Sequence, residues 1–215
     1  MRSAQETDEE RRARIYPIIL SEYNPAWPEW YAEEKANLER LIGLENIVRI
    51  SHYGSTSVPG LTAKPTIDIL LEIDETADID RLIAALLLPE YICLDEAALT
   101  MQTAPPHLMF IKGYLPDGFA EKVYHIHVVY TGDHIESGGA GFTSTINTGL
   151  LPGVSHSGDD ALRFRDYLIA HPETAAEYAE LKRKLFRDYE HNRDGYTEAK
   201  TDFIKRVTER ARFYG

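Results

Sequence analysis

Two short segments rich in β-branched residues constrain the fold of this chain most. They are residues 46–53 (NIVRISHY) and 66–73 (TIDILLEI), and each has the length and composition of a β-strand. The connection between them contains Gly, Ser and Pro, and Gly54-Ser55 directly follows the first segment. We therefore predict two strands joined by a short turn, with Asp68 presented by the second strand.

The remaining elements follow an order of strands first and helices afterwards. Apolar periodicity, proline stops and turn residues define them along the chain. This order predicts an α+β (mixed α/β) fold, in which helices pack on a mixed β-sheet and a helical region forms the C-terminal part. The predicted elements are helices at 26–42 and 76–88, strands at 107–112 and 122–130 around a GYLPDG turn, and helices at 160–170, 173–189 and 196–213.

The domain organisation predicted from these elements is simple. Residues 1–20 form a charged lead-in, and residues 21–215 form a single domain whose helical part is 160–215. Residues 131–159 contain seven glycines and little periodicity, which predicts a long loop. The GGAGF run at 138–142 lacks the strand-to-helix context of a dinucleotide fingerprint, so it is assigned to this loop.

Charge and composition exclude several classes of partner. The chain has 23 Lys and Arg against 35 Asp and Glu, a net charge of −12, and such a surface repels long nucleic acid. A small phosphorylated molecule in a local basic pocket is compatible with this charge. No stretch reaches the roughly 18 apolar residues of a membrane span. Cys93 is the only cysteine, which excludes an internal disulfide and suits a cytoplasmic location.

The segment 51–73 (SHYGSTSVPGLTAKPTIDILLEI) carries the chemistry of a phosphate site. Gly54 permits close approach of the backbone, and the Ser55 hydroxyl and the following amides can hold phosphate oxygens. Lys64 adds a positive charge, and Asp68 can bind a divalent cation. The alternative for each feature is structural: a plain turn at Gly54, and a satisfied carboxylate at Asp68.

Together these residues resemble the nucleotidyltransferase signature, and GSTSVPGLTAKPTIDILL is similar to the GrpB-like branch of the polymerase-β-like superfamily. The resemblance continues in NPAWPEW, YHIHVV, FRDYLIAHPE and YTEAKTDFI. It implies a nucleotidyltransferase-like sheet, a nucleotide as partner, and Mg²⁺ or Mn²⁺ as cofactor. It further implies catalytic roles for Asp68, Ser55 and Lys64 and substrate binding by Gly54, Ser55, Lys64, Arg165, Tyr196 and Lys200.

One departure from the signature bears on activity. The second carboxylate of the superfamily would stand at position 70, which is Leu70 here. Glu72 faces the same side as Asp68, but their Cα atoms are separated by ~13 Å of strand, too far to share one ion. Our leading hypothesis is metal-dependent transfer of a nucleotidyl group to an unknown acceptor. Leu70 supports the alternative of an inactive nucleotide-binding or regulatory module.

Two histidines offer another set of metal ligands. His125 and His127 point to the same side of a strand at ~7 Å Cα spacing, and would complete a site with Asp68 if the two strands are neighbours. Imidazole ligands favour zinc, manganese or iron, which allows a metalloenzyme of another class, such as a hydrolase. The structural alternative is a hydrogen-bonded histidine pair. His52 is predicted to support the turn rather than to bind a ligand.

Overall fold

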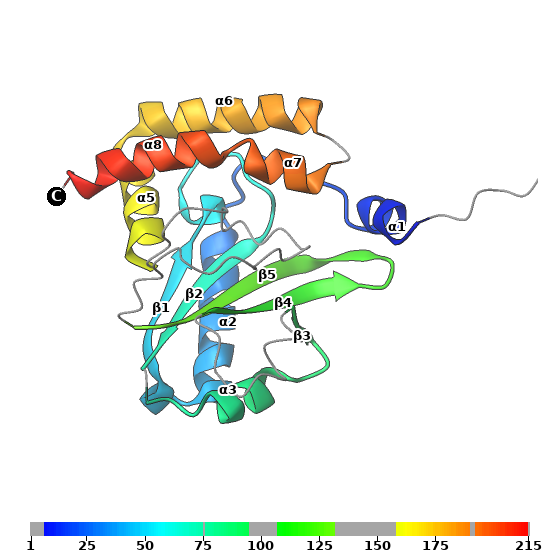
Figure 1. Cartoon of the computed structure of the whole chain (residues 1–215), viewed down its shortest axis with the longest axis vertical. Helices are drawn as coiled ribbons and strands as arrows, with labels where there is room; N and C mark the ends of the chain where they lie inside the picture. Colours follow the sequence, from blue (N-terminus) through cyan, green and yellow to red (C-terminus); the bar gives the residue numbers. More distant parts are fainter. Residues whose placement is uncertain (1–6, 75, 95–106, 132–157, 190–191, 215) are drawn as a thin grey trace, which may run out of the picture.

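A five-stranded sheet forms the centre of the computed structural model, which describes residues 7–74, 76–94, 107–131, 158–189 and 192–214 (Figure 1). The strands are β1 (Ile47–Tyr53), β2 (Ile67–Ile73), β3 (Tyr91–Cys93), β4 (His107–Leu115) and β5 (Gly118–Tyr130). The helices are α1 (Asp8–Ile15), α2 (Trp27–Ile42), α3 (Ile79–Leu86), α5 (Gly158–Ala170), α6 (Pro172–Asp188), α7 (Arg193–Glu198) and α8 (Thr201–Arg212), and the 3-10 turns are η1 (Leu44–Asn46) and η2 (Ser55–Ser57).

The sheet is mixed, with strand order β1-β2-β5-β4-β3. Strand β2 is antiparallel to β1 and parallel to β5, and β4 is antiparallel to both β5 and β3. The parallel pairing places residues from distant parts of the sequence side by side at the centre of the sheet. The α+β class predicted from the order of elements is confirmed.

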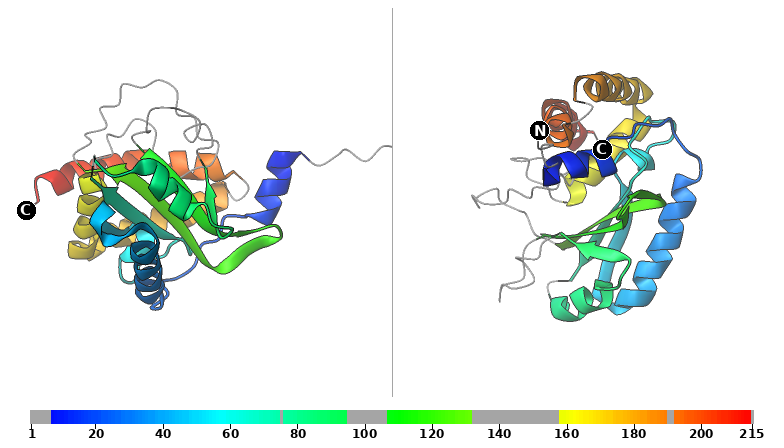
Figure 2. Two further views of the ribbon diagram at one scale, coloured as in Figure 1. Left: turned by 90° about the horizontal axis from the view of Figure 1, so that it is seen from below. Right: turned by 90° about the vertical axis from the view of Figure 1, so that its right-hand side faces the viewer.

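Alternate residues of β2 and β5 build the main core on one face of the sheet, where α2 packs (Figure 2). Because successive side chains of a strand point to opposite faces, the residues between them face the other side. Those residues include Asp68, His125 and His127. The main core contains Ile67, Ile69 and Leu71 of β2, Ile126 and Val128 of β5, and Trp27 and Leu38 of α2.

A second apolar cluster fixes the connection between β1 and β2. Val58 and Leu61 of this connection are each 2% exposed and pack against Leu168 of α5, Tyr178 of α6 and Phe203 of α8. These helices gather at the end of the sheet opposite α3 (Figure 1). The C-terminal helices therefore close over the turn that follows β1.

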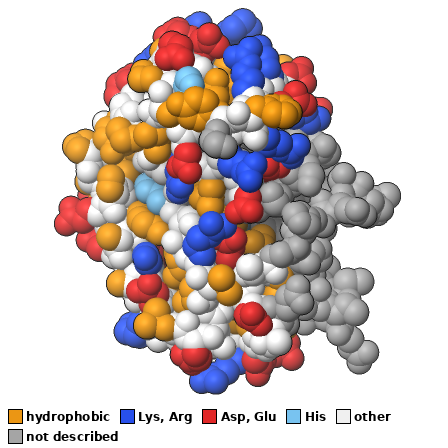
Figure 3. Space-filling model, turned by 90° about the vertical axis from the view of Figure 1, so that its left-hand side faces the viewer, with side chains coloured by type: hydrophobic (Ala, Val, Ile, Leu, Met, Phe, Trp, Pro, Cys, Tyr) orange, Lys and Arg blue, Asp and Glu red, His pale blue; other side chains and the backbone are white. Residues whose placement is uncertain are grey.

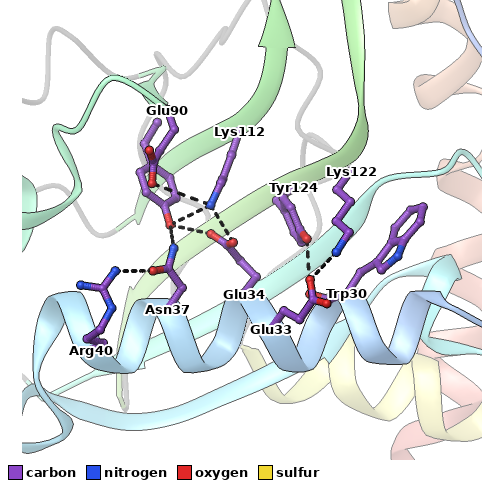
Figure 4. Close-up of polar contacts among 10 residues, drawn as sticks. Trp30, Glu33, Glu34, Asn37, Arg40, Glu90, Lys112, Lys122 and Tyr124 are labelled. Atoms are coloured by element: carbon purple, nitrogen blue, oxygen red, sulfur yellow. Dashed lines mark hydrogen bonds and ion pairs between the residues drawn. The ribbon is translucent and has the colours of Figure 1, made fainter.

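A buried polar network joins α2 to strands β3 and β4 (Figure 4). Glu34 is 4% exposed, and its carboxylate accepts hydrogen bonds from Tyr91 Oη at 2.6 Å and Lys112 Nζ at 2.8 Å. Asn37 donates to Tyr91 Oη at 2.8 Å. Burial of a carboxylate is tolerated here because both of its oxygens are satisfied, one of them by a cation.

Gly113 and Asn192 explain two differences from the predicted elements. The turn predicted over GYLPDG (113–118) lies in this segment but is shorter, because Gly113 (φ +87°) is a bulge at which the β4–β5 register shifts, and the hairpin closes at 115–118. The helix predicted at 196–213 is wrong in its bounds. The Asn192 side chain caps α7 by accepting from Gly195 N, so Gly195 lies inside a helix that ends before α8 begins. The short strand β3 was not predicted.

Two predicted regions can be followed only in part. Most of the loop predicted at 131–159, including 138–142, lies outside the described residues, and α5 begins at Gly158. Within the predicted lead-in, Ile18 is 7% exposed, and the Tyr16 ring packs against Tyr114 and Phe119.

The surface view bears on the net charge. On the face drawn in Figure 3, acidic and basic side chains of the described residues are interspersed with apolar ones. The acidic side chains on that face therefore do not form one continuous negative patch. Among the described helices, none combines the length and the apolar character that crossing a membrane requires.

Candidate metal and phosphate site

The turn at Gly54 is shaped by its backbone and by the neighbouring Asp68. Gly54 has φ +73° and ψ −174°, a conformation that only glycine adopts readily. Tyr53 pairs with Asp68 in the antiparallel register, so the turn begins beside this carboxylate. A Cβ atom on Gly54 would lie 2.3 Å from Asp68 Oδ2. The glycine thus allows the turn and the carboxylate to occupy adjacent space.

Asp68, His125 and His127 form an Asp–His cluster on the face of the sheet opposite α2. The parallel register pairs Asp68 with His125 and Leu70 with His127, so the strand adjacency on which the histidine hypothesis depended is present. His125 Nδ1 lies 3.4 Å from Asp68 Oδ1. One potential ligand atom of each of the three residues lies within 4.8 Å of the other two. His125 and His127 are 3% and 1% exposed.

This donor set fits a divalent cation. One carboxylate oxygen and two imidazole nitrogens are ligands that zinc and manganese accept. Glu72 lies outside the cluster and accepts hydrogen bonds from Arg49, one of them from Nη2 at 2.8 Å, and this interaction raises the pKa of Arg49. Leu70 is 4% exposed and packs with Tyr53 and Leu162. The position of the missing superfamily carboxylate is therefore filled by an apolar contact.

Tyr114 contacts the cluster from β4 and was not predicted. Its hydroxyl lies 2.8 Å from His125 Nε2, and the two rings stack with centroids 5.9 Å apart. One nitrogen of His125 thus meets the phenol, and the other faces Asp68. Nothing in the sequence indicates this contact, because it depends on the bulge at Gly113 and the register beyond it.

Three lysines gather near the turn, and we refer to Lys64, Lys182 and Lys200 as the lysine cluster. Lys182 of α6 is 2% exposed, and its Nζ donates to Ser55 Oγ at 3.1 Å. Burial, and then the charges of Lys200, Arg183 and Lys64, hold the pKa of Lys182 well below its usual value. Lys64 Nζ and Lys200 Nζ lie 5.9 and 4.6 Å from the centre of the Tyr196 ring.

The predicted substrate-binding residues are thus brought together only in part. Lys64, Tyr196 and Lys200 are neighbours, although Tyr196 belongs to α7 and Lys200 precedes α8. Lys182 was missed. The signal that could have found it is a lysine four residues after Tyr178, on the apolar face of a helix.

Arg165 and His52 form contacts that hold the end of β1 in place. Arg165 Nη1 donates to the His52 carbonyl oxygen at 2.8 Å. The His52 ring stacks on Tyr31, with centroids 4.8 Å apart, and its Nε2 lies 3.0 Å from Thr56 Oγ1. Because the Thr56 hydroxyl donates to the Thr66 carbonyl, His52 Nε2–H is the donor to Thr56. Burial lowers the pKa of His52 to about 4, partly offset by Asp68.

The fold and the site together define an α+β domain with a carboxylate–imidazole cluster beside a glycine–serine turn. Residues 17–140 and 143–210 match the family described as GrpB protein. The chain belongs to the GrpB family, which is part of the nucleotidyltransferase-like superfamily.

Individual proteins are similar to this chain over most of its length. The crystal structure of conserved protein GrpB from Enterococcus faecalis is similar, with a TM-score of 0.67 and 29% identity over 92% of this chain and 100% of that one. The UPF0157 protein PA4798 of Pseudomonas aeruginosa is 34% identical over 87% of this chain, and the dephospho-CoA kinase of Mycolicibacterium paratuberculosis is 27% identical over 91%. The matches span 65% and 46% of the lengths of these two relatives, and 49% of the UPF0157 protein YqkA of Bacillus subtilis.

Proposed function

We propose that this protein transfers a nucleotidyl group from a nucleoside triphosphate to an acceptor in a metal-dependent reaction. The observation that carries the proposal is the position of Asp68, which lies beside the histidines on one side and the Gly54 turn on the other. A cation site and a turn suited to phosphate oxygens are therefore adjacent. The similarity to a protein named dephospho-CoA kinase is consistent with a nucleotide-related role.

Each part of the site has a role in this proposal. Asp68, His125 and His127 would hold Mn²⁺, Mg²⁺ or Zn²⁺, of which the imidazoles disfavour Mg²⁺. When bound, the cation would offset negative charge on phosphoryl oxygens. The Ser55 hydroxyl and the Ser55 and Thr56 amides at the start of η2 orient the phosphates, and Lys64 and Lys200 stabilise the charge that develops during transfer.

Two other functions are favoured by specific observations. The apolar packing of Leu70 favours a module that binds a nucleotide without turning it over. The two buried histidines favour metal-dependent hydrolysis of a phosphorylated molecule. Product analysis separates the three functions. Transfer requires an acceptor and releases pyrophosphate, hydrolysis proceeds with water alone, and the binding module releases no product.

The first test is the melting temperature of wild type and Asp68→Asn with nucleoside triphosphates and Mn²⁺. Ligand that binds only the folded state stabilises it, so the wild type should shift upwards. Asp68→Asn should lose the cation-dependent shift and melt at an equal or higher temperature without ligand, since functional carboxylates are often kept at a cost in stability.

Glu72→Gln is the matched control, because Glu72 lies on the same strand and face but pairs with Arg49. It should lower the melting temperature and leave the ligand-induced shift intact. Absence of any shift in the wild type at millimolar triphosphate would refute the proposal. A large loss of stability in Asp68→Asn would instead assign Asp68 a structural role.

A further inference from the structure

Lys182 is a buried lysine without a buried anion beside it in the described part of the chain. Its side chain is almost fully enclosed, and its ammonium group contacts Ser55 Oγ and lies 4.4 Å from the centre of the Tyr178 ring. Within residues 7–74, 76–94, 107–131, 158–189 and 192–214, no carboxylate forms an ion pair with it. Burying an ammonium group without such a pair is strongly unfavourable. Tyr178 and Ser55 offset only part of this cost.

The charged groups nearest to Lys182 increase this cost. Lys64 and Lys200, placed around the Tyr196 ring, both act on Lys182 by repulsion. Arg183, the next residue of α6, turns away and donates to Glu22 Oε1 at 3.1 Å and Thr62 Oγ1 at 2.6 Å. The two neighbouring residues of α6 thus differ in their surroundings. Arg183 forms an ion pair with Glu22, whereas Lys182 lies near the positive charges of Lys64 and Lys200.

The position of this charge is specific. Ser55, the partner of Lys182, is the first residue of η2 and directly follows Gly54, which contacts Asp68. An anion on Lys182 would therefore lie next to the turn of the candidate site. A bound anion would favour protonated Lys182, and three ammonium groups match the charge of linked phosphoryl groups better than that of a single phosphate group, which carries about −1.5 to −2 at neutral pH as a monoester.

We propose that the lysine cluster and Ser55 Oγ form a binding site for a phosphate chain of two or more phosphoryl groups. The site recognises the chain by its charge and requires neither the nucleoside nor the cation. This inference deepens the proposed function, on which it rests for the identity of the natural ligand, by naming the part of the substrate that is recognised. Lys182 is its central residue, because it contacts the turn directly and is shielded from water.

The experiment titrates the metal-free protein, in the presence of EDTA, with pyrophosphate, tripolyphosphate and orthophosphate by isothermal calorimetry. The wild type should bind the first two at least about tenfold more tightly than orthophosphate. Lys182→Met should weaken pyrophosphate binding at least about tenfold, since it removes a charged hydrogen-bond donor. Without ligand, Lys182→Met should melt at an equal or higher temperature, because a buried amine without an ion-pair partner has been replaced by an apolar side chain.

Lys184→Met is the matched control, since Lys184 is exposed on the same helix and pairs with Asp188. It should bind pyrophosphate as the wild type does. Lys64→Met provides a second variant at a less buried position, and it should weaken binding in the same direction. Equal pyrophosphate affinity in wild type, Lys182→Met and Lys64→Met would overturn the inference, as would equal affinity of the wild type for orthophosphate and pyrophosphate.

Failure of this inference and failure of the proposed function give different results. The titrations with EDTA do not involve the Asp–His cluster, so Asp68→Asn should bind pyrophosphate at least as well as the wild type. Pyrophosphate binding without any cation-dependent effect of Asp68→Asn would support the lysine cluster and refute the metal-dependent reaction. If the wild type instead shows a cation-dependent rise in melting temperature that Asp68→Asn loses, but binds no phosphate chain in EDTA, the metal-dependent reaction is supported and the lysine cluster is refuted.

Discussion

The substitution Gly54→Ala tests how closely the turn and the Asp–His cluster depend on each other. The φ and ψ of Gly54 lie in a region that costs other residues about 1–3 kcal/mol. The added Cβ would also meet Asp68 Oδ2 at 2.3 Å and Asp68 Cβ at 3.0 Å. The carboxylate must then rotate, which changes the 3.4 Å separation of Asp68 Oδ1 and His125 Nδ1.

Gly60→Ala is the matched control within the same connection. Gly60 also has a positive φ, +77°, but a Cβ atom there would meet nothing within 4 Å. This substitution should cost about 1–2 kcal/mol for the backbone alone. We expect Gly54→Ala to cost at least about 1 kcal/mol more in urea unfolding, and to weaken Mn²⁺ binding at least about tenfold, whereas Gly60→Ala leaves Mn²⁺ binding unchanged.

A double substitution isolates the collision. Asp68→Ala removes Oδ2 and leaves only the contact with Cβ, so Gly54→Ala should cost less in this background. The expected coupling is about 0.5–3 kcal/mol. Three results together would refute the reasoning. Gly54→Ala would lose no more stability than Gly60→Ala, its loss of stability would simply add to that of Asp68→Ala, and it would bind Mn²⁺ as the wild type does.

Two further predictions concern the surroundings of the cluster. Tyr114→Phe removes the hydroxyl that orients His125 and should weaken Mn²⁺ binding, measured by calorimetry, about 10- to 100-fold. The control Tyr16→Phe loses only its hydrogen bond to the Leu115 carbonyl and should bind Mn²⁺ as the wild type does. Equal affinities of the two variants for Mn²⁺ would contradict the role of Tyr114 in orienting His125. His52 has a folded-state pKa of about 4, so it stays neutral while the unfolded chain takes up a proton below about pH 6.5. The free energy of unfolding therefore decreases as pH falls between these values, by about 2 kcal/mol from pH 7.5 to 5.0. His52→Gln, which keeps a donor for Thr56, should show a smaller decrease in urea unfolding at the two pH values. An identical decrease in both proteins would exclude His52 as the cause.

The sequence was sufficient where local patterns determine structure. The strands that present Asp68 and the histidines follow from β-branched composition and from turn residues, and the distance of Asp68 from the Gly54 turn is what made it a candidate. The same-side spacing of His125 and His127 follows from strand geometry. Their proximity to Asp68 remained conditional, because sequence does not specify which strands pair.

The residues that escaped prediction depend on tertiary structure. Lys182 lies far from the turn in sequence and reaches it only because α6 packs over Val58 and Leu61. Tyr114 reaches His125 only beyond the bulge at Gly113. Lys200 adjoins Tyr196 across the break between α7 and α8, which was predicted as one helix. In each case, packing between distant elements determines the contact.

The parallel pairing of β2 and β5 has a consequence for how the protein folds. Asp68 and His125 become neighbours only through this pairing, and the chain between them includes α3, β3 and β4. Contacts of such long sequence separation form slowly, because the intervening loop must be closed first. The backbone hydrogen bonds inside helices α5 to α8 are local, so helical structure in this part of the chain can form earlier. During refolding, recovery of Mn²⁺ binding should therefore follow recovery of helical circular dichroism, which makes the cation a reporter of the completed sheet.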